Sequence, residues 1–290
     1  MDPWRDVERS IREAAGASFT LESRCAVGGG CINECFQVRG GGRTYFVKLN
    51  HPEKAEMFSA EAAGLREIAR TRTVRVPEAV CHGASHAACW LVLEFLDLQS
   101  GGTASMRELG RRLAALHRVT ARHYGWTRDN TIGATPQANT PTNDWATFWR
   151  EHRIGFQLRL ATSNGHQLAG GEHLMERLPA FFSGYQPAPS LLHGDLWSGN
   201  AAETGTGEPV VFDPAIYYGD READLAMTEL FGGFPAAFYE AYRSEYPLDA
   251  GYAGRKPLYN LYHVLNHLNL FGGGYREQAE RLIRQLVGPV

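Results

Sequence analysis

Acidic and amide side chains in two short segments of the chain have a spacing that is typical of few folds. The first reads His193-Gly-Asp-Leu-Trp-Ser-Gly-Asn200, and the second, Val210-Val-Phe-Asp213, places another aspartate after a short apolar strand. Asp and Asn are common turn residues, so Asp195 or Asn200 alone would indicate only a turn. The combination, with Asp195 five residues before Asn200, matches the catalytic loop and the metal-binding aspartate of kinase folds.

These residues supply the groups that phosphoryl transfer from a nucleotide requires. Mg²⁺, which accompanies ATP phosphates, prefers hard oxygen ligands, and the Asp213 carboxylate and the Asn200 amide provide them. An acceptor hydroxyl needs a carboxylate within hydrogen-bonding reach, and Asp195 stands at the expected position. We therefore predict ATP and Mg²⁺ as cofactors, Asp195 as the catalytic residue, and Asn200 and Asp213 as metal ligands.

The first third of the chain predicts a nucleotide-binding half for such a fold. Three runs of β-forming residues are separated by glycine-rich turns, the first of which is Gly28-Gly29-Gly30. Glycines allow the backbone of such a turn to approach and cover phosphate groups. An ordinary glycine hairpin has the same composition, so the motif indicates a phosphate-binding turn only in combination with the residues that follow it.

A lysine and a glutamate follow that turn in the order typical of kinases. Lys48 lies in the third predicted strand, and Glu61 lies on the apolar face of the next predicted helix, between Met57 and Leu65. A carboxylate on an apolar face needs a partner, although a single strand lysine is usually solvated. We predict a Lys48–Glu61 ion pair, with the lysine reaching the α- and β-phosphates.

A buried strand ends at Glu94 to Leu96, just before the best linker candidate, residues 99–105. A hinge at this place would offer backbone N–H and C=O groups to adenine, and an ordinary strand end is the alternative. After the linker the chain reads mainly as amphipathic helices. A chain of 290 residues also exceeds what one hydrophobic core serves efficiently.

The fold class we predict is α+β, a protein-kinase-like fold with two lobes. Residues 1–96 are expected to form a β-rich ATP-binding lobe with one main helix. Residues 97–290 are expected to form a mostly helical lobe for catalysis and substrate binding.

Composition excludes several other classes of protein. The formal charge of −3 gives no bulk attraction to nucleic acid or to anionic membranes. No apolar run approaches the roughly 20 residues of a membrane helix, and the N-terminus has no apolar signal core. The five cysteines include no Cys-x-x-Cys pair, which disfavours a zinc site or a disulfide framework. We expect a cytoplasmic enzyme with no nucleic-acid and no membrane partner.

Further motifs extend over nearly the whole chain and are more particular than the catalytic loop. They include Trp197, the stretch from Asp213 to Met227, and the tyrosine- and histidine-rich segment from Leu258 to Asn269. Through them the chain resembles the fructosamine kinase (ketosamine 3-kinase) family, relatives of the aminoglycoside phosphotransferases. The resemblance implies phosphorylation of a ketosamine at the sugar O3, a deglycation-type activity on a small ketoamine or on a glycated amine or protein.

The catalytic segment also departs from that of protein kinases. His193 is followed by Gly194 instead of Arg, and only ten residues separate Asp213 from Asp224. This spacing leaves no room for a long regulatory loop, so we expect an enzyme that is active as made. Asp224 is expected to bond the catalytic loop from the start of a helix.

Three residues are candidates for contact with the acceptor. The indole of Trp197 can pack on the C–H face of a sugar and donate to a hydroxyl, or it can merely wedge the loop. Tyr262 and His267 belong to the tyrosine- and histidine-rich segment, where packing is the alternative role.

Cys31 directly follows the glycine triplet and is a redox candidate. A phosphate-binding turn near Lys48 is a positive environment that favours thiolate. The chain is therefore expected to be a monomer or a redox-linked homodimer, and the alternative for Cys31 is a small packed residue.

Two other functions remain open from the sequence. One is a phosphotransferase that acts on an aminoglycoside or another small hydroxyl compound. The other is a catalytically idle nucleotide-binding protein. The complete set of Lys48, Glu61, Asp195, Asn200 and Asp213 argues against the idle protein, because binding alone has no need for all five.

Overall fold

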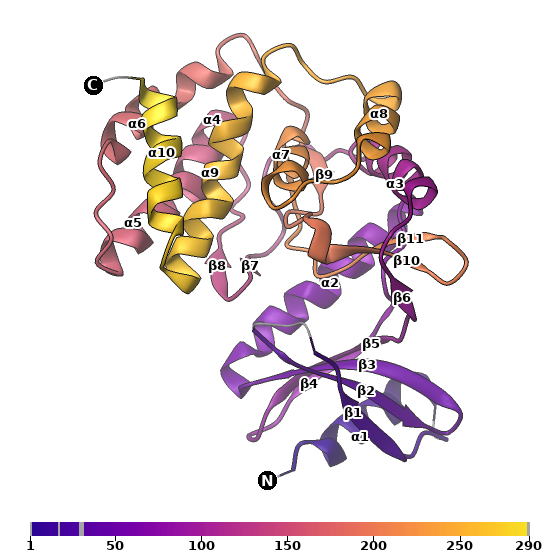
Figure 1. The fold of residues 1–290 in the computed structure, drawn as a ribbon. Helices are drawn as coiled ribbons and strands as arrows, with labels where there is room; N and C mark the ends of the chain where they lie inside the picture. The colour runs from indigo at the N-terminus through magenta and orange to yellow at the C-terminus, as the bar shows by residue number, and fades with distance from the viewer. Residues whose placement is uncertain (1, 17, 29–31, 289–290) are drawn as a thin grey trace. The chain divides into compact units, whose positions relative to one another are not determined.

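The computed structural model describes residues 2–16, 18–28 and 32–288 (Figure 1). The chain forms two compact units. The first unit consists of residues 1–105 and 201–214, and the second of residues 106–200 and 215–290. The first unit therefore extends beyond the predicted boundary at residue 96 and includes a segment from much later in the chain.

An antiparallel sheet of five strands forms the centre of the first unit, in the order β1-β2-β3-β5-β4. The strands are β1 (Ser23–Ala26), β2 (Glu34–Gly40), β3 (Arg43–Asn50), β4 (Ala79–Ala84) and β5 (Cys89–Glu94). Gly41 and Gly42 connect β2 to β3 with φ of 54° and 73°. A two-residue hairpin turn of type I′ needs positive φ at both positions, which explains this glycine pair.

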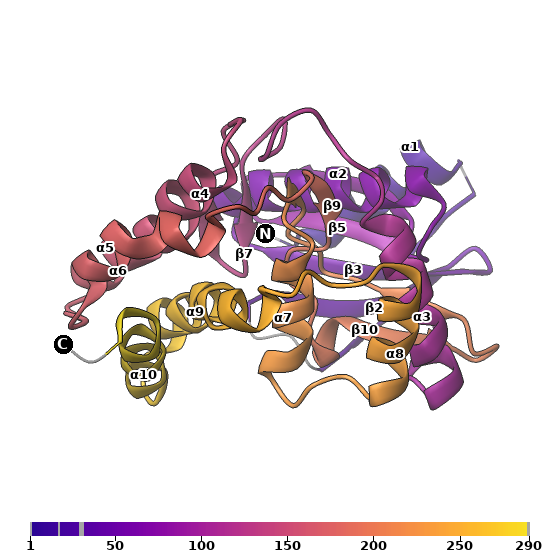
Figure 2. The same cartoon turned by 90° about the horizontal axis from the view of Figure 1, so that it is seen from above.

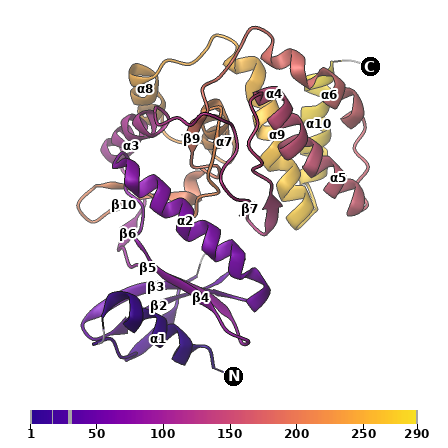
Figure 3. The same cartoon turned by 180° about the vertical axis from the view of Figure 1, so that it is seen from behind.

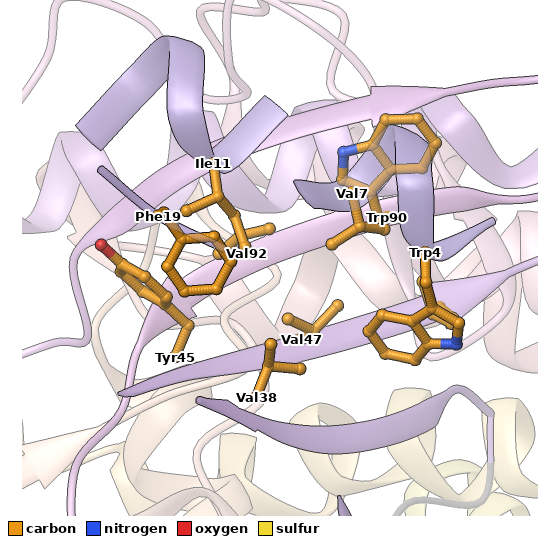
Figure 4. Packing of buried hydrophobic residues seen from close by; sticks show 10 residues of the cluster. Trp4, Val7, Ile11, Phe19, Val38, Tyr45, Val47, Trp90 and Val92 are labelled. Atoms are coloured by element: carbon orange, nitrogen blue, oxygen red, sulfur yellow. The ribbon is translucent and has the colours of Figure 1, made fainter. Parts of the chain in front are cut away.

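Helices pack on opposite faces of this sheet (Figure 3). One face packs against α1 (Trp4–Ala15), whose Trp4, Val7 and Ile11 meet strand residues such as Val47 and Val92 (Figure 4). The other face packs against α2 (Ala55–Thr71), which follows the short helix η1 (Pro52–Lys54). Since strand side chains alternate between faces, Lys48 points away from the α1 core that Val47 joins.

A small sheet explains why residues 201–214 belong to the first unit. It has the order β11-β10-β6 and consists of β6 (Leu98–Gln99), β10 (Ala201–Thr204) and β11 (Pro209–Val211). Gln99 pairs with Glu203, and the Arg75 carbonyl accepts from the backbone N–H of Val211. These long-range pairings lie outside what local sequence patterns can indicate.

The second unit is mostly helical, with short hairpins. Its longer helices are α3 (Thr103–Leu116, from residue 106 onward), α5 (Gly155–Ser163), α7 (Glu222–Leu230), α8 (Ala236–Glu245), α9 (Tyr252–Phe271) and α10 (Tyr275–Val287). Its shorter elements are β7 (Asn130–Ile132), β8 (Thr135–Gln137), α4 (Trp145–Phe148), η2 (Trp149–Ile154), α6 (Gly171–Arg177), η3 (Leu178–Phe182), β9 (Ser190–Leu192), η4 (Ser198–Asn200) and β12 (Tyr217–Gly219).

The helix α9 forms the centre of this unit and packs against α5, α7 and α10 (Figure 2). The α+β, kinase-like class predicted from the sequence is thus confirmed: an antiparallel sheet with helices in one unit and a helical second unit. None of the helices in the described part of the chain combines the length and apolar character that a membrane span requires.

Candidate active site

The predicted ion pair of the first unit is present, and it has a third member. Lys48, which is 3% exposed, places Nζ 2.6 Å from Glu61 Oε1 and 2.7 Å from Asp213 Oδ1. Burial disfavours the charged amine, but the two carboxylates outweigh it and raise the pKa of Lys48. The lysine is therefore a firmly protonated cation that connects β3, α2 and the loop after β11.

One lysine does not neutralise two carboxylates. Burial, together with the neighbouring Asp213 carboxylate, raises the pKa of Glu61 even though Lys48 favours its ionised form. The cluster thus sets two acidic side chains against one cation. A group of this kind is suited to an additional cation.

The backbone of Asp213 is in an uncommon conformation. Its φ of 56° lies in the left-handed region, which non-glycine residues seldom adopt. Among the described non-glycine residues, only Arg72 shares this feature, and Arg72 ends α2 as its C-cap. Asp213 ends no helix, and its side chain is 46% exposed, so the strained backbone presents a carboxylate to solvent.

The backbone of the catalytic loop in the second unit is bound by a single buried carboxylate. Asp224, in the first turn of α7, accepts the backbone N–H groups of His193 at 2.7 Å and Gly194 at 2.8 Å. It also accepts from His117 Nε2 at 3.1 Å. Burial opposes ionisation, but these hydrogen bonds outweigh it and lower the pKa of Asp224. The predicted structural role of Asp224 is confirmed.

Two other contacts fix the path of the loop. Gly194 has φ of 82°, and a Cβ there would lie 2.1 Å from the Ala215 carbonyl oxygen, so only glycine fits. His193 Nδ1 accepts the backbone N–H of Asp195 at 3.3 Å, in accord with a bonding role instead of a basic one.

Asp195 and Asn200 are in direct contact. Asn200 Nδ2 donates to the Asp195 carbonyl at 2.8 Å and to its carboxylate Oδ2 at 3.2 Å. These bonds turn the amide nitrogen of Asn200 toward Asp195. The amide oxygen is then the group of Asn200 suited to another partner.

Trp197 lies on the loop and is 38% exposed. A Cβ on Gly199 would come within 2.4 Å of the indole, so the ring lies directly over this glycine. The indole therefore packs against the loop and also has an exposed surface. This position is compatible with both predicted roles, which are contact with the sugar and packing within the loop.

The two candidates on α9 differ. Tyr262 is 1% exposed, and its hydroxyl donates to Gln137 Oε1 at 2.6 Å, so its position is that of a packing residue and the predicted acceptor contact is not supported. His267 is partly exposed, and its Nδ1 lies 2.8 Å from the His263 carbonyl. Because a carbonyl only accepts, Nδ1 carries the proton; burial lowers the pKa of His267, which leaves Nε2 as an acceptor.

At the predicted hinge, Glu94 is already engaged. Its backbone N–H donates to the Glu78 carbonyl at 2.9 Å, and its carboxylate accepts two bonds from Arg75. The N–H and the carboxylate of Glu94 thus have partners within the unit, and the predicted adenine contact through the Glu94 carbonyl and the backbone of Leu96 stays a prediction.

The glycine turn is described only in part. Gly29, Gly30 and Cys31 lie outside the described residues, so their phosphate-binding and redox roles stay predictions, while Gly28 is exposed. At the other end of the turn, Asn50 Nδ2 donates to Asn33 Oδ1 at 2.7 Å and to the Ile32 carbonyl. The sequence reasoning missed this role of Asn50, although Asn50 shares a strand face with Lys48.

Comparison with known proteins identifies a common family. The model of the fructosamine kinase family matches residues 3–288. A probable ketoamine kinase from Synechocystis is 50% identical over 98% of this chain and 96% of its own length. A chloroplastic protein-ribulosamine 3-kinase from Arabidopsis thaliana is 43% identical over 95% of this chain and 87% of its own length.

Solved structures give the same result. A crystal structure from Haemophilus somnus, of a protein assigned as a fructosamine-3-kinase, has a TM-score of 0.94 at 31% identity and covers 98% of both chains. An aminoglycoside phosphotransferase has a TM-score of 0.62 at 16% identity, covering 99% of this chain and 100% of its own, which is a likeness of fold alone. With a kinase-like fold, a lysine held by two carboxylates and a family match over nearly its full length, this chain belongs to the fructosamine kinase family.

Proposed function

We propose that the protein is an ATP-dependent phosphotransferase that phosphorylates a sugar hydroxyl, O3, of ketosamines, a deglycation-type activity. The observation that carries this function is the buried Lys48 between Glu61 and Asp213, an arrangement that a merely structural lysine does not need. The relatives named ketoamine kinase and ribulosamine 3-kinase support a ketosamine as the acceptor. The aminoglycoside phosphotransferases, at 16% identity, support an antibiotic acceptor far less.

On the nucleotide side, the Lys48 amine would bind the α- and β-phosphates while Glu61 holds its side chain in place. Gly28 to Gly30 would cover the phosphates, and the backbone near Leu96 would bond adenine. Lys48 would then leave Asp213 partly uncompensated, ready for a metal ion.

The donors present fit Mg²⁺. No group of three or more His, Cys, Asp or Glu side chains among the described residues could hold a metal ion by itself. Mg²⁺ is usually bound by one or two protein carboxylates together with substrate phosphates and water. The Asp213 carboxylate and the Asn200 amide oxygen would hold it, and the ion would neutralise charge on the transferred phosphoryl group.

On the acceptor side, Asp195 would orient the O3 hydroxyl and accept its proton. The new bond joins O3 to the γ-phosphorus, the bond from that phosphorus to the β,γ-bridging oxygen breaks, and ADP leaves with the electron pair. Trp197 would pack on the sugar, and His267 Nε2 would accept a hydrogen bond from the substrate.

The test is a choice between acceptors. Purified protein with ATP and Mg²⁺ is offered 1-deoxy-1-morpholinofructose or kanamycin, and the product is identified by ³¹P NMR. We expect a ketosamine 3-phosphate and, for Asp195→Asn, a kcat lower by roughly 10²–10⁴-fold with ATP binding retained. Phosphorylation of kanamycin alone, or an unchanged kcat for the variant, would contradict the assignment.

Small ketosamines are the substrate class that the family indicates. Use of intact glycated proteins, a redox-linked homodimer through Cys31 and a location in the cytoplasm stay predictions.

A further inference from the structure

Exposed aromatic side chains of the second unit gather at one place. In the part of the chain that the structure describes, only Val27, Trp197 and Phe271 are large hydrophobic residues with high exposure. Phe271 is 52% exposed. Trp197 and Phe271 are connected by ring contacts, although 74 positions separate them in the sequence.

The connection is a continuous series of rings, which we call the aromatic run. The ring centroids of Trp197 and Phe231 are 6.4 Å apart, those of Phe231 and His267 are 4.6 Å apart, and those of His267 and Phe271 are 5.6 Å apart. Tyr275 adds a side contact at 5.1 Å from His267. All these separations lie within or close to the usual range for aromatic pairs.

Local structure explains how the run forms. Phe231 directly follows the last residue of α7, and His267 and Phe271 are one turn apart on α9, where residues four apart share a face. The chain then reverses through glycines at 272–274, two of them with positive φ, so that Tyr275 at the start of α10 returns to His267. Four separate segments thus contribute rings to one surface.

Core packing does not account for this surface. The core side of α9 is formed by fully buried residues such as Leu265 and Leu268. Phe231, His267 and Tyr275 are instead only partly covered, and the run begins two residues after Asp195. A partly exposed aromatic surface that begins at a catalytic loop is typical of a ligand-binding surface.

We propose that the part of the aromatic run beyond Trp197, formed by Phe231, His267, Phe271 and Tyr275, is the subsite for the amine substituent of the ketosamine, which rests on the ketosamine kinase activity proposed above. With O3 at Asp195 and the sugar on Trp197, the amine joined to C1 needs a surface that continues from the sugar. The run is such a surface, and Phe271 leaves its far end open to solvent.

The chemistry of the rings selects the class of amine. A ketosamine nitrogen is a secondary amine that is protonated near neutral pH, and aromatic faces attract such cations. Longer apolar or aromatic substituents, including a lysine side chain that continues into a peptide, can extend over Phe271. A small substituent that bears a carboxylate, such as glycine, reaches less of the run and meets the negative faces of the rings.

The experiment compares two substrates that differ only in the amine, N-fructosylbenzylamine and N-fructosylglycine. KM and kcat are measured for wild type, Phe271→Ala, Tyr275→Ala and the control Arg281→Ala, an exposed residue of α10 outside the run. We expect KM for the benzylamine derivative to rise about three- to tenfold in the Phe271 and Tyr275 variants. KM for the glycine derivative, both kcat values and the control should change by less than about twofold.

Equal changes for both substrates, or none for either, overturn the assignment. Calorimetric binding of the same two compounds to wild type and Phe271→Ala without ATP decides the subsite independently of catalysis. If wild type phosphorylates neither compound, the proposed function fails, while a benzylamine affinity that drops several-fold in Phe271→Ala still supports the subsite. Unchanged affinity for both compounds rejects it.

Discussion

The two units arrange their acidic side chains in opposite ways. In the first unit, one lysine is the shared partner of two acids, Glu61 and Asp213. In the second unit, Asp224 alone receives three donors, from His193, Gly194 and His117. The first arrangement sets two acids against one cation, whereas in the second every donor meets one buried acceptor that holds the loop. The same kind of side chain can therefore serve different ends: the side chain of Asp213 is 46% exposed and shares its cation with Glu61, whereas Asp224 is buried and has three donors of its own.

The sharpest way to break this comparison is Asp224→Asn. The amide nitrogen of the new asparagine is a donor and would lie against another donor. The buried backbone N–H groups of the catalytic loop would also lose their charged acceptor. We expect the free energy of unfolding to fall by about 3 kcal/mol, measured by urea denaturation. An unchanged free energy of unfolding would show that Asp224 does not stabilise the loop.

The same change at Asp213 should lower activity strongly and stability only slightly. Asp213→Asn removes a like charge beside Glu61, keeps a residue type that tolerates positive φ, and should change the free energy of unfolding by less than about 1 kcal/mol. Phosphoryl transfer should nevertheless fall roughly 10²-fold or more, because the carboxylate proposed to hold Mg²⁺ is gone. Glu61→Gln is the comparison variant: it removes the acid that positions Lys48 but keeps the proposed metal ligand, so it should weaken ATP binding while the Mg²⁺ dependence remains.

A third carboxyl refines the comparison. Asp220 is fully buried and accepts from the hydroxyls of Tyr259 and Tyr185, but it lies beside Glu222. Burial and the Glu222 carboxylate raise the pKa of Asp220 to about 7. A raised folded pKa means that the folded state binds more protons than the unfolded state from about pH 4 to 7.

Stability contributed by this carboxyl is therefore present at low pH and is lost as pH rises through about 7. The difference in unfolding free energy between wild type and Asp220→Asn should change by up to about 1.4 kcal/mol per pH unit in that window. Buried histidines such as His117, whose pKa is lowered, make stability depend on pH in the opposite direction. Their contribution is the same in both proteins and cancels in the difference, which therefore reports on Asp220. A flat difference from pH 4.5 to 7 would show that Asp220 ionises normally.

Much of the site could be predicted from the sequence because its chemistry is local. The spacing of Asp195, Asn200 and Asp213 and the strand–helix order of Lys48 and Glu61 are readable without a structure. What could not be read depends on long-range pairing. β6 and β10 meet only in the folded chain, so residues 201–214 could not be assigned to the first unit.

Helical spacing also could not distinguish the two sides of α9. Tyr262 and His267 are five positions apart and thus lie on different sides of the helix, but the sequence does not say which side meets the core. Tyr262 faces Gln137 and Trp149, and His267 faces the aromatic run. The shared use of Lys48 by Glu61 and Asp213 was equally invisible, because it depends on a conformation of Asp213 that is rare for its residue type.

The placement of the Trp197 indole over Gly199 constrains how such a loop can evolve. A side chain at position 199 would overlap the outer edge of the ring, so the exposed indole would have to turn away to admit it. The effect of a substitution at position 199 therefore depends on which residue occupies position 197, which makes the two positions epistatic. Where the tryptophan is kept, glycine is the residue at 199 that lets the ring stay in its present position.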